Sequence, residues 1–154
     1  MIYNYFHTRE GRLNLGYIIA QGLYWMSLCC IVSLGSAYLT NRGYSTVGIG
    51  VLFAVAYLIA TVLQQVISVA TDQSAKFNVV DVLTVLGTIL SIILLGSAFS
   101  SGKGFATSFT FLLSAMVVMV MQPFLNALNF HLEKYNVKMN FGVARASGSF
   151  FFFI

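Results

Sequence analysis

Long apolar runs alternate with short polar segments along the chain. Four runs cover about residues 13–39, 46–71, 79–99 and 105–130, and a fifth, incomplete run covers 141–154. Each of the first four meets the roughly 20 residues that a helix needs to cross about 30 Å of hydrocarbon. Helices satisfy their own backbone in lipid, and these runs are too long and unbroken for barrel strands. The pattern predicts an all-α integral membrane protein with four transmembrane helices and the start of a fifth.

Composition agrees with a chain whose solvent is lipid. The 154 residues are 58% hydrophobic and 8% charged, and the mean hydropathy is +0.86. A soluble domain carries about 25% charged residues, so this chain has too few to cover a globule in water. The net charge of +4 comes from basic residues that stand singly, and no block of them could follow nucleic-acid phosphates. The expected partner is therefore the lipid bilayer and not a nucleic acid.

The sequence indicates neither an enzyme active site nor a metal site. It has no HExxH, GxSxG or phosphate-loop motif, and no pair of carboxylates is spaced for acid–base catalysis. Its two cysteines, Cys29 and Cys30, are adjacent in an apolar run and lack the spacing of a metal site. We therefore expect no enzymatic activity, no cofactor and no bound metal.

The basic residues predict the orientation in the membrane. If residues 1–12 are cytoplasmic, six of the eight Lys and Arg residues lie inside and two lie outside. The inside set is Arg9, Arg12, Lys76, Lys134, Lys138 and Arg145, and the outside set is Arg42 and Lys103. This asymmetry follows the positive-inside rule. The sequence thus predicts a multi-pass protein of the cell membrane, with a cytoplasmic N-terminus at 1–12 and a helical bundle at 13–154.

Polar side chains recur at helical spacing on both sides of the charged turn between the fourth and fifth runs. At the end of the fourth run the intervals are 4, 3 and 4, and the residues are Gln122, Asn126, Asn129 and Glu133. In the fifth run the intervals are 4 and 3, and the residues are Arg145, Ser149 and Phe152. Residues at such intervals share one helical face. If the two helices are antiparallel neighbours, both rows line one polar cleft inside the membrane.

The first two runs carry polar rows as well. These rows are Asn14, Tyr17, Gln21 and Tyr24 in the first run, and Tyr57, Thr61, Gln64 or Gln65, Ser68 and Asp72 in the second. The third run is almost entirely apolar, which predicts a lipid-facing or supporting helix. Three polar-striped helices favour a bundle around a wet cavity. The alternative is that these side chains only form hydrogen bonds between helices, each of which stabilises the bundle by about 0.6 kcal/mol. For Arg145, the alternative is that its side chain extends to the cytoplasmic interface.

At these residues the chain resembles the lactose permease-like branch of the major facilitator superfamily, the oligosaccharide and nucleoside:proton symporters. The resemblance is strongest in FGVARASGS at 141–149, which follows Pro123, Asn126 and Glu133. It implies that this chain is the truncated N-terminal half of a twelve-helix fold, with four helices and the start of a fifth. Two six-helix halves of such a fold rock about a central site to give alternating access.

The loop after the second run carries the superfamily's Asp-centred cytoplasmic signature in a reduced form. Asp72 is present and Lys76 occupies a basic position, whereas Ser68 and Ala75 stand where glycines are usual. In the family this loop packs closely and acts as a conformational latch. Asp72 and Lys76 are four residues apart, and a contact between them would contribute only tenths of a kcal/mol if exposed, roughly 0.2–0.5.

In this branch a fourth-helix carboxylate pairs with a fifth-helix arginine, and an aromatic residue further along the fifth helix stacks on the sugar. The corresponding residues here are Asn126, Arg145 and Phe152, so the carboxylate and the usual tryptophan are both replaced. Asn126 can exchange hydrogen bonds with a hydroxyl but cannot neutralise Arg145. This departure argues against galactoside specificity. It leaves a hydroxyl-rich or anionic solute, because an unpaired guanidinium suits a carboxylate or phosphate.

The expected function is that of the N-terminal fragment of a secondary active transporter for a small polar solute, such as a sugar, nucleoside or organic anion. The candidate solute-binding residues are Arg145, Asn126, Gln122, Asn129, Ser149, Phe152, Tyr17, Gln21 and Tyr24. The resemblance puts most proton-coupling carboxylates in the second half, so proton-coupled transport would need the missing C-terminal helices or a partner chain. The 14 residues of the fifth run make about 21 Å of helix, which predicts a truncated product, a fragment or a split subunit.

Two other functions stay open. A non-transporting membrane scaffold or assembly protein would not need three polar-striped helices. A small dimeric exporter would need a membrane-embedded carboxylate as proton carrier, and Asp72, Asp81 and Glu133 all fall at the cytoplasmic ends of the expected helices.

Overall fold

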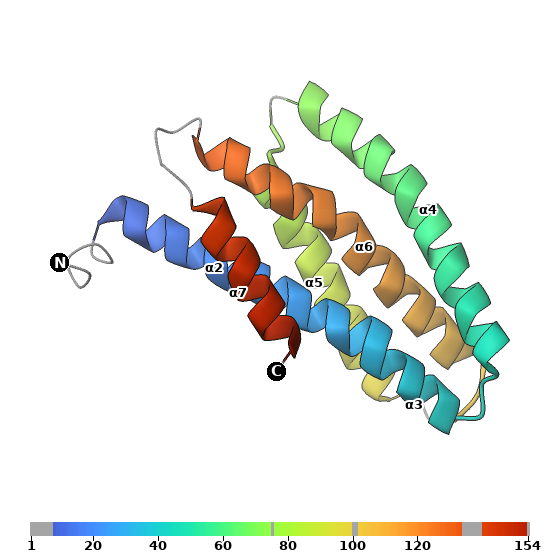
Figure 1. Ribbon diagram of the computed structural model, residues 1–154. Helices are drawn as coiled ribbons and strands as arrows, with labels where there is room; N and C mark the ends of the chain where they lie inside the picture. Colours follow the sequence, from blue (N-terminus) through green and yellow to red (C-terminus); the bar gives the residue numbers. More distant parts are fainter. Residues whose placement is uncertain (1–7, 75, 100–101, 134–139, 154) are drawn as a thin grey trace.

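Every regular element of the described part of the chain is helical. The computed structural model describes residues 8–74, 76–99, 102–133 and 140–153 (Figure 1). The elements are α2 (Arg9–Leu28), η1 (Cys29–Leu34), α3 (Gly35–Asn41), α4 (Thr46–Gln73), α5 (Val79–Ala98), α6 (Phe105–Glu133) and α7 (Phe141–Phe153). Of the positions predicted from the sequence, Ala75, Lys134 and Lys138 lie outside the described ranges, as do residues 1–7 of the predicted N-terminal segment and residue 154 of the fifth run.

Within the residues that the structure describes, four helical stretches are long and apolar enough to cross a membrane. They are Arg9–Asn41, which combines α2, η1 and α3, together with α4, α5 and α6. Each contains one of the four apolar runs, with ends that differ by a few residues. The all-helical class with four candidate membrane helices, predicted from the sequence, is thereby confirmed.

The first span is a continuous helix with a π-helical turn in its second half. Thr8 caps the start, because its hydroxyl oxygen accepts a hydrogen bond from the Gly11 N–H at 3.0 Å. The turn Cys29–Leu34 is wider than an α-helical turn, and both of its cysteines are free thiols. It lies between α2, which packs on α7, and α3, which leads to α4.

Polar residues at the starts of α4 and α5 act as helix caps. The Ser45 Oγ accepts a hydrogen bond from the Gly48 N–H at 3.1 Å. At α5, Asn78 Oδ1 accepts from the Asp81 N–H at 3.2 Å, and Asp81 Oδ2 accepts from the Asn78 N–H at 3.0 Å. This reciprocal pair is a capping box, which satisfies donors that the helix itself leaves free. Asp81 therefore has a structural role at the helix start.

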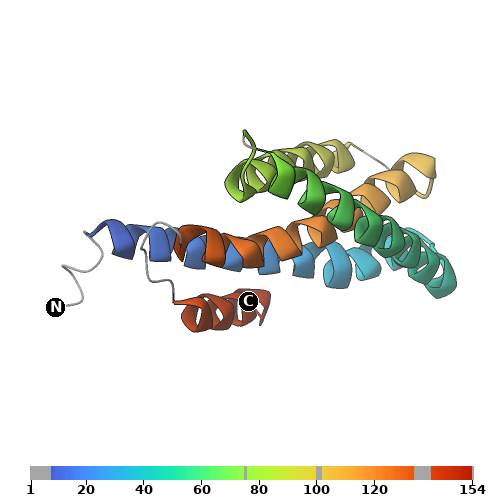
Figure 2. The same ribbon diagram turned by 90° about the horizontal axis from the view of Figure 1, so that it is seen from above.

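Helix α6 lies at the centre of the packing. It contacts α4, α5 and α2, whereas α7 packs on α2 (Figures 1 and 2). Buried residues follow α6 along most of its length, from Thr107 to Asn129. The pairing of α6 with α7, on which a shared polar cleft would depend, is not found among the described residues, where α7 packs on α2 instead. The polar rows of α6 and α7 therefore do not face each other as adjacent helices.

Proline at position 123 of α6 is matched by a side chain of α4. Pro123 has no backbone N–H, so the carbonyl group of Met119, four residues earlier, loses its partner within the helix. Gln64 replaces that partner, since its Nε2 donates to the Met119 carbonyl oxygen at 2.7 Å. An unsatisfied carbonyl group is costly in lipid, so this hydrogen bond stabilises α6. It joins α4 to α6 at the position where α6 lacks one of its own hydrogen bonds.

Apolar side chains face outward over much of the bundle. The most exposed helix is α5, which buries Leu86 and Leu90 but exposes residues such as Ile92 and Leu95. Large exposed apolar faces are rare on soluble monomers, and lipid is the solvent that suits them. The exposure of α5 agrees with the lipid-facing role expected for the third run.

Two loops meet at one end of the bundle. The Tyr44 hydroxyl donates to the carbonyl oxygen of Gly104 at 2.9 Å, and Lys103 Nζ donates to the carbonyl oxygen of Gly43 at 3.0 Å. The segment before α4 is thereby joined to the segment before α6. Arg42 and Lys103 consequently lie at the same end of the bundle, as the predicted topology requires.

Candidate functional site

Two glycines allow α7 to approach α2 closely. A Cβ atom at Gly148 would lie 2.8 Å from Trp25 Nε1, and one at Gly22 would lie 2.6 Å from a phenyl ring of α7. Small residues are the usual means by which membrane helices come this close. At the start of α7, the Asn140 N–H donates to Asn14 Oδ1 at 2.8 Å. Asn140, at the start of α7, contacts Asn14 near the start of α2, and Gly148 contacts Trp25 further along both helices. The two helices are therefore parallel neighbours.

The guanidinium group of Arg145 lies over the indole of Trp25. Its Cζ is 4.7 Å from the ring centroid. The same indole packs on Gly148 and meets the ring of Phe152 edge to face, with centroids 6.2 Å apart. Trp25 is midway along the helix Arg9–Asn41. The arginine side chain therefore extends away from the start of α7 and toward the middle of the span, opposite to the direction that snorkelling to the interface would take.

No carboxylate neutralises Arg145 within the described residues. Its contact there is the indole face, and no Asp or Glu of the described ranges forms an ion pair with it. A cation–π contact contributes about 0.5–1 kcal/mol at an exposed site and about 2 when desolvated. The Trp25 ring in turn meets the Tyr24 ring edge to face, with centroids 5.6 Å apart. Among the described residues, the cation is thus held by an aromatic face.

The polar row of α2 faces the interior. Tyr17, Gln21 and Tyr24 are 2%, 0% and 5% exposed. The Gln21 Nε2 donates to the Tyr17 hydroxyl oxygen at 3.0 Å. Three buried atoms beside this pair have no partner among the described residues: Gln21 Oε1, the Tyr24 hydroxyl and Trp25 Nε1. Because buried polar atoms in folded proteins are nearly always hydrogen-bonded, this group is a candidate site for a polar ligand.

The polar row of α6 is separate from this group. Asn129 is buried, and its Nδ2 donates to Glu133 Oε1 at 3.3 Å while its Oδ1 has no partner in the described part of the chain. Gln122 and Asn126 are half-buried. The row lies on a helix that contacts α2 but does not pack on α7. The structure therefore does not join Asn126 to Arg145.

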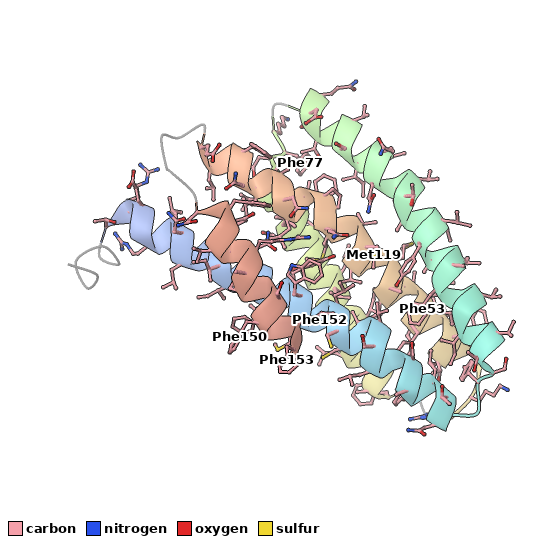
Figure 3. The ribbon with its side chains drawn as sticks, viewed as in Figure 1. Phe53, Phe77, Met119, Phe150, Phe152 and Phe153 are labelled. Atoms are coloured by element: carbon pink, nitrogen blue, oxygen red, sulfur yellow. The ribbon has the colours of Figure 1, made fainter. Side chains whose placement is uncertain are left out.

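The three predicted residues of α7 differ in their surroundings. Arg145 and Phe152 both contact Trp25, whereas Ser149 is exposed. Phe152 keeps 39% of its surface exposed, and it lies near the C-terminal end of α7 with Phe150 and Phe153 (Figure 3). Arg145 and Phe152 are thus part of the α2–α7 site.

The predicted latch residues lie at the C-terminal end of α4, with Asp72 in its last turn and Lys76 just after it. Asp72 and Lys76 are both exposed, and no ion pair joins them within the described residues. The turn between them is closed by Ser74, whose Oγ accepts hydrogen bonds from the N–H groups of Lys76 and Phe77 at 3.2 and 3.1 Å. Local backbone geometry rather than a charge pair shapes this loop.

Sequence reasoning missed Trp25. It stands one position after the polar row of the first run, so a search for recurring polar residues passes over it. The available signal was its spacing, since Trp25 follows Gln21 by four residues and is the single tryptophan of the chain.

A groove of about 550 Å³ lies between α2, α5 and α6, and Tyr24 is one of its lining residues. Most of its lining is apolar, as at Leu23, Leu90 and Leu125. Its Thr84 and Thr88 hydroxyls donate to carbonyl oxygens of their own helix, both at 2.8 Å. The groove therefore offers few free polar groups to a solute.

The chemistry available at the α2–α7 site is binding. It combines a cation on an indole face, the ring of Phe152, and hydrogen-bonding atoms that have no partner among the described residues, midway along a candidate membrane span. No group of three or more His, Cys, Asp or Glu residues that could hold a metal ion occurs in the ranges that the structure describes.

In comparisons with known proteins, no family model, no curated protein and no solved structure matches this chain.

Proposed function

We propose that this chain forms the N-terminal part of a secondary active transporter of the lactose permease-like branch of the major facilitator superfamily. The transporter moves a small polar solute, such as a sugar, nucleoside or organic anion, by alternating access, and it is proton-coupled in the full-length form. It works in the cell membrane with its N-terminus in the cytoplasm. The observation that carries this proposal is the position of Arg145, a cation on Trp25 near the middle of a membrane span.

An arginine near the middle of a membrane span, without a carboxylate partner among the described residues, indicates a ligand-binding site. Ionisable groups within membrane spans are expensive, and they mark solute or ion pathways when no structural partner explains them. For Arg145 the described residues supply an indole face but no carboxylate. The unpartnered atoms of Gln21, Tyr24 and Trp25 add hydrogen-bonding capacity at the same place. A polar solute would use both the charge and these atoms.

Coupling to protons requires more than the described helices. Asp72, Asp81 and Glu133 all lie in the first or last turns of their helices, away from the middle of the spans. The resemblance assigns most of the coupling carboxylates to a second half. Transport therefore depends on further C-terminal helices or on a partner chain that supplies them.

Solute binding by the purified chain in lipid nanodiscs tests the proposal. The apparent melting temperature is measured with millimolar lactose, uridine or D-galacturonate, since a ligand at about 100 times its Kd stabilises the folded state by about 2.7 kcal/mol. At least one solute should raise the melting temperature, and Arg145→Ala should abolish the rise. A matched control is Arg42→Ala, because Arg42 also lies 4.7 Å from an aromatic ring, that of Tyr38.

Two results would contradict the proposal: no stabilisation by any of the three solutes, or stabilisation that persists in Arg145→Ala. Asn126→Ala refines the site. If Asn126 bonds the solute, its replacement should weaken binding by about 1–3 kcal/mol. Unchanged binding would assign Asn126 to helix packing alone.

A second candidate is a non-transporting scaffold or assembly protein. The apolar groove between α2, α5 and α6 favours it, because such a groove suits a helix of another protein. The same experiment separates the two functions. A scaffold predicts that no solute stabilises the chain and that Arg145→Ala changes nothing in the presence of solute.

A further inference from the structure

The two arginines that lie on aromatic rings have different surroundings. Arg42 lies on Tyr38 at the end of the first span, where water and lipid headgroups can solvate its charge. Arg145 lies on Trp25 near the middle of the same span. Arg145 is half-buried. A partly desolvated cation without a counter-ion is unfavourable, and an aromatic face offsets this only in part. The site of Arg145 is therefore one negative charge short of neutrality within the described residues.

The unpartnered atoms around Arg145 are mostly donors. The Trp25 indole N–H can only donate, and the Tyr24 hydroxyl has its proton free to donate. Both belong to the rings around the guanidinium, since Arg145 lies on the Trp25 ring and the Tyr24 ring meets that ring edge to face, with centroids 5.6 Å apart. A guanidinium beside two further donors matches the oxygens of a carboxylate.

One unpartnered atom is an acceptor. Gln21 Oε1 lies one helical turn before Trp25 on the same face of α2, and the Nε2 of the same amide donates to the Tyr17 hydroxyl oxygen. An acceptor cannot bond a carboxylate, but it can accept a hydrogen bond from a hydroxyl group. The site thus offers donors at one end and an acceptor one turn away.

We propose that this site takes a small hydroxylated carboxylate of the sugar-acid class, with the carboxylate on Arg145 and a hydroxyl on Gln21. Trp25 is a positioning residue that holds the guanidinium in place before the anion binds. The inference rests on the proposed function and narrows its solute to one chemical class. The bidentate guanidinium–carboxylate pair supplies the negative charge that the protein itself does not provide.

Trp25 gives a direct readout because it is the single tryptophan of the chain. Its emission is recorded in nanodiscs during titration with D-galacturonate and with D-galactose, which differ by one carboxylate. Sodium acetate at equal ionic strength controls for the charge alone. The expected result is a saturable change with galacturonate, none with galactose or acetate, and none in Arg145→Gln. In Arg42→Gln the galacturonate response should be unchanged.

The role of Trp25 is tested by galacturonate-induced thermal stabilisation, which needs no tryptophan. Trp25→Leu removes the ring face and should weaken galacturonate binding about tenfold. Trp25→Phe keeps a ring face and should recover part of that loss. A structural role alone would instead lower the melting temperature of both variants without changing the galacturonate affinity of the folded protein.

The outcomes separate this inference from the proposed function. An Arg145-dependent response to galactose, lactose or uridine without a stronger response to galacturonate overturns the sugar-acid class and leaves the transporter proposal intact. A response to acetate equal to that of galacturonate overturns the role of Gln21. Absence of a response to every solute overturns both proposals.

Discussion

The contacts α2–α7 and α4–α6 both join membrane helices through polar residues, yet they differ in how completely these residues are satisfied. Between α4 and α6, Gln64 bonds the Met119 carbonyl that Pro123 leaves free. Between α2 and α7, a cation lies on an indole, and nearby donor and acceptor atoms have no partner among the described residues. The first contact is complete by itself, whereas the second has unused binding capacity.

This difference shows that a polar row in a membrane helix has two physical meanings. A side chain that satisfies a backbone atom of its neighbour stabilises the bundle and has nothing left for a solute. A side chain that is buried without a partner keeps its hydrogen-bonding capacity for a ligand, at a cost to stability. Each variant below changes one of the two contacts, or the loops that close the bundle, without changing the others.

The largest effect is expected from Gly148→Leu. The new side chain would occupy the space of the Trp25 indole, so α7 would have to move away from α2. Overpacking of this kind costs about 3 kcal/mol, and the contact of Arg145 with the indole should be lost with it. The free energy of unfolding, measured by SDS titration, and the Trp25 emission spectrum report the two consequences.

Gly142→Leu is the matched control for that variant. It places the same side chain on the same helix, where a Cβ would meet no atom within 4 Å. Stability should change little in this control. Equal losses in the two variants would contradict a close approach of α7 to α2 at Gly148.

A smaller effect is expected from Gln64→Leu, which leaves the Met119 carbonyl without a partner. The unfolding free energy should fall by about 1–2 kcal/mol. Pro123→Ala provides an N–H for that carbonyl, so Gln64→Leu should be less costly in the Pro123→Ala background. Gln65→Leu, at an exposed position of the same helix, should be nearly neutral. Equal costs of Gln64→Leu in both backgrounds would show that the bond to Met119 is not its main role.

The smallest effect is expected from Tyr44→Phe, which disconnects the two loops at one end. The Gly104 N–H, which donates to the Tyr44 oxygen at 3.2 Å, loses its acceptor. Stability should fall by about 1 kcal/mol, and hydrogen exchange at the Gly104 amide should become faster. The contact between Lys103 and Gly43 does not involve the hydroxyl and should persist. Unchanged exchange at Gly104 would indicate that the loops are held together by other contacts.

The sequence predicted the helices well because their signal is local. An apolar run of about 20 residues has few alternatives in lipid, and each of the first four runs became a helix. The buried positions of Tyr17, Gln21 and Tyr24 also followed from spacing alone, since residues at intervals of 3 and 4 share a face. The third run, which lacks polar residues, became the exposed helix α5.

Helix pairing could not be predicted in the same way, because it depends on residues distant in the chain. The polar rows of α6 and α7 would line one cleft only if the two helices were neighbours, but Gly22 and Gly148 bring α7 onto α2 instead. Glycines leave no periodic signal of their own. The same limit hid Trp25, whose importance depends on Arg145, which lies 120 residues later in the chain.

Cross-linking of cysteine pairs tests the central claim, that the α7 site is built on α2. In a Cys29→Ser/Cys30→Ser background, one variant carries Ile18→Cys with Ser147→Cys, positions joined by the Ser147 Oγ donating to the Ile18 carbonyl oxygen at 3.4 Å. The other carries Asn126→Cys with Ser149→Cys, the pairing of α6 with α7. A short bifunctional methanethiosulfonate should protect the first pair from a later maleimide-PEG gel shift and leave the second pair reactive. Protection of the second pair but not the first would contradict the account.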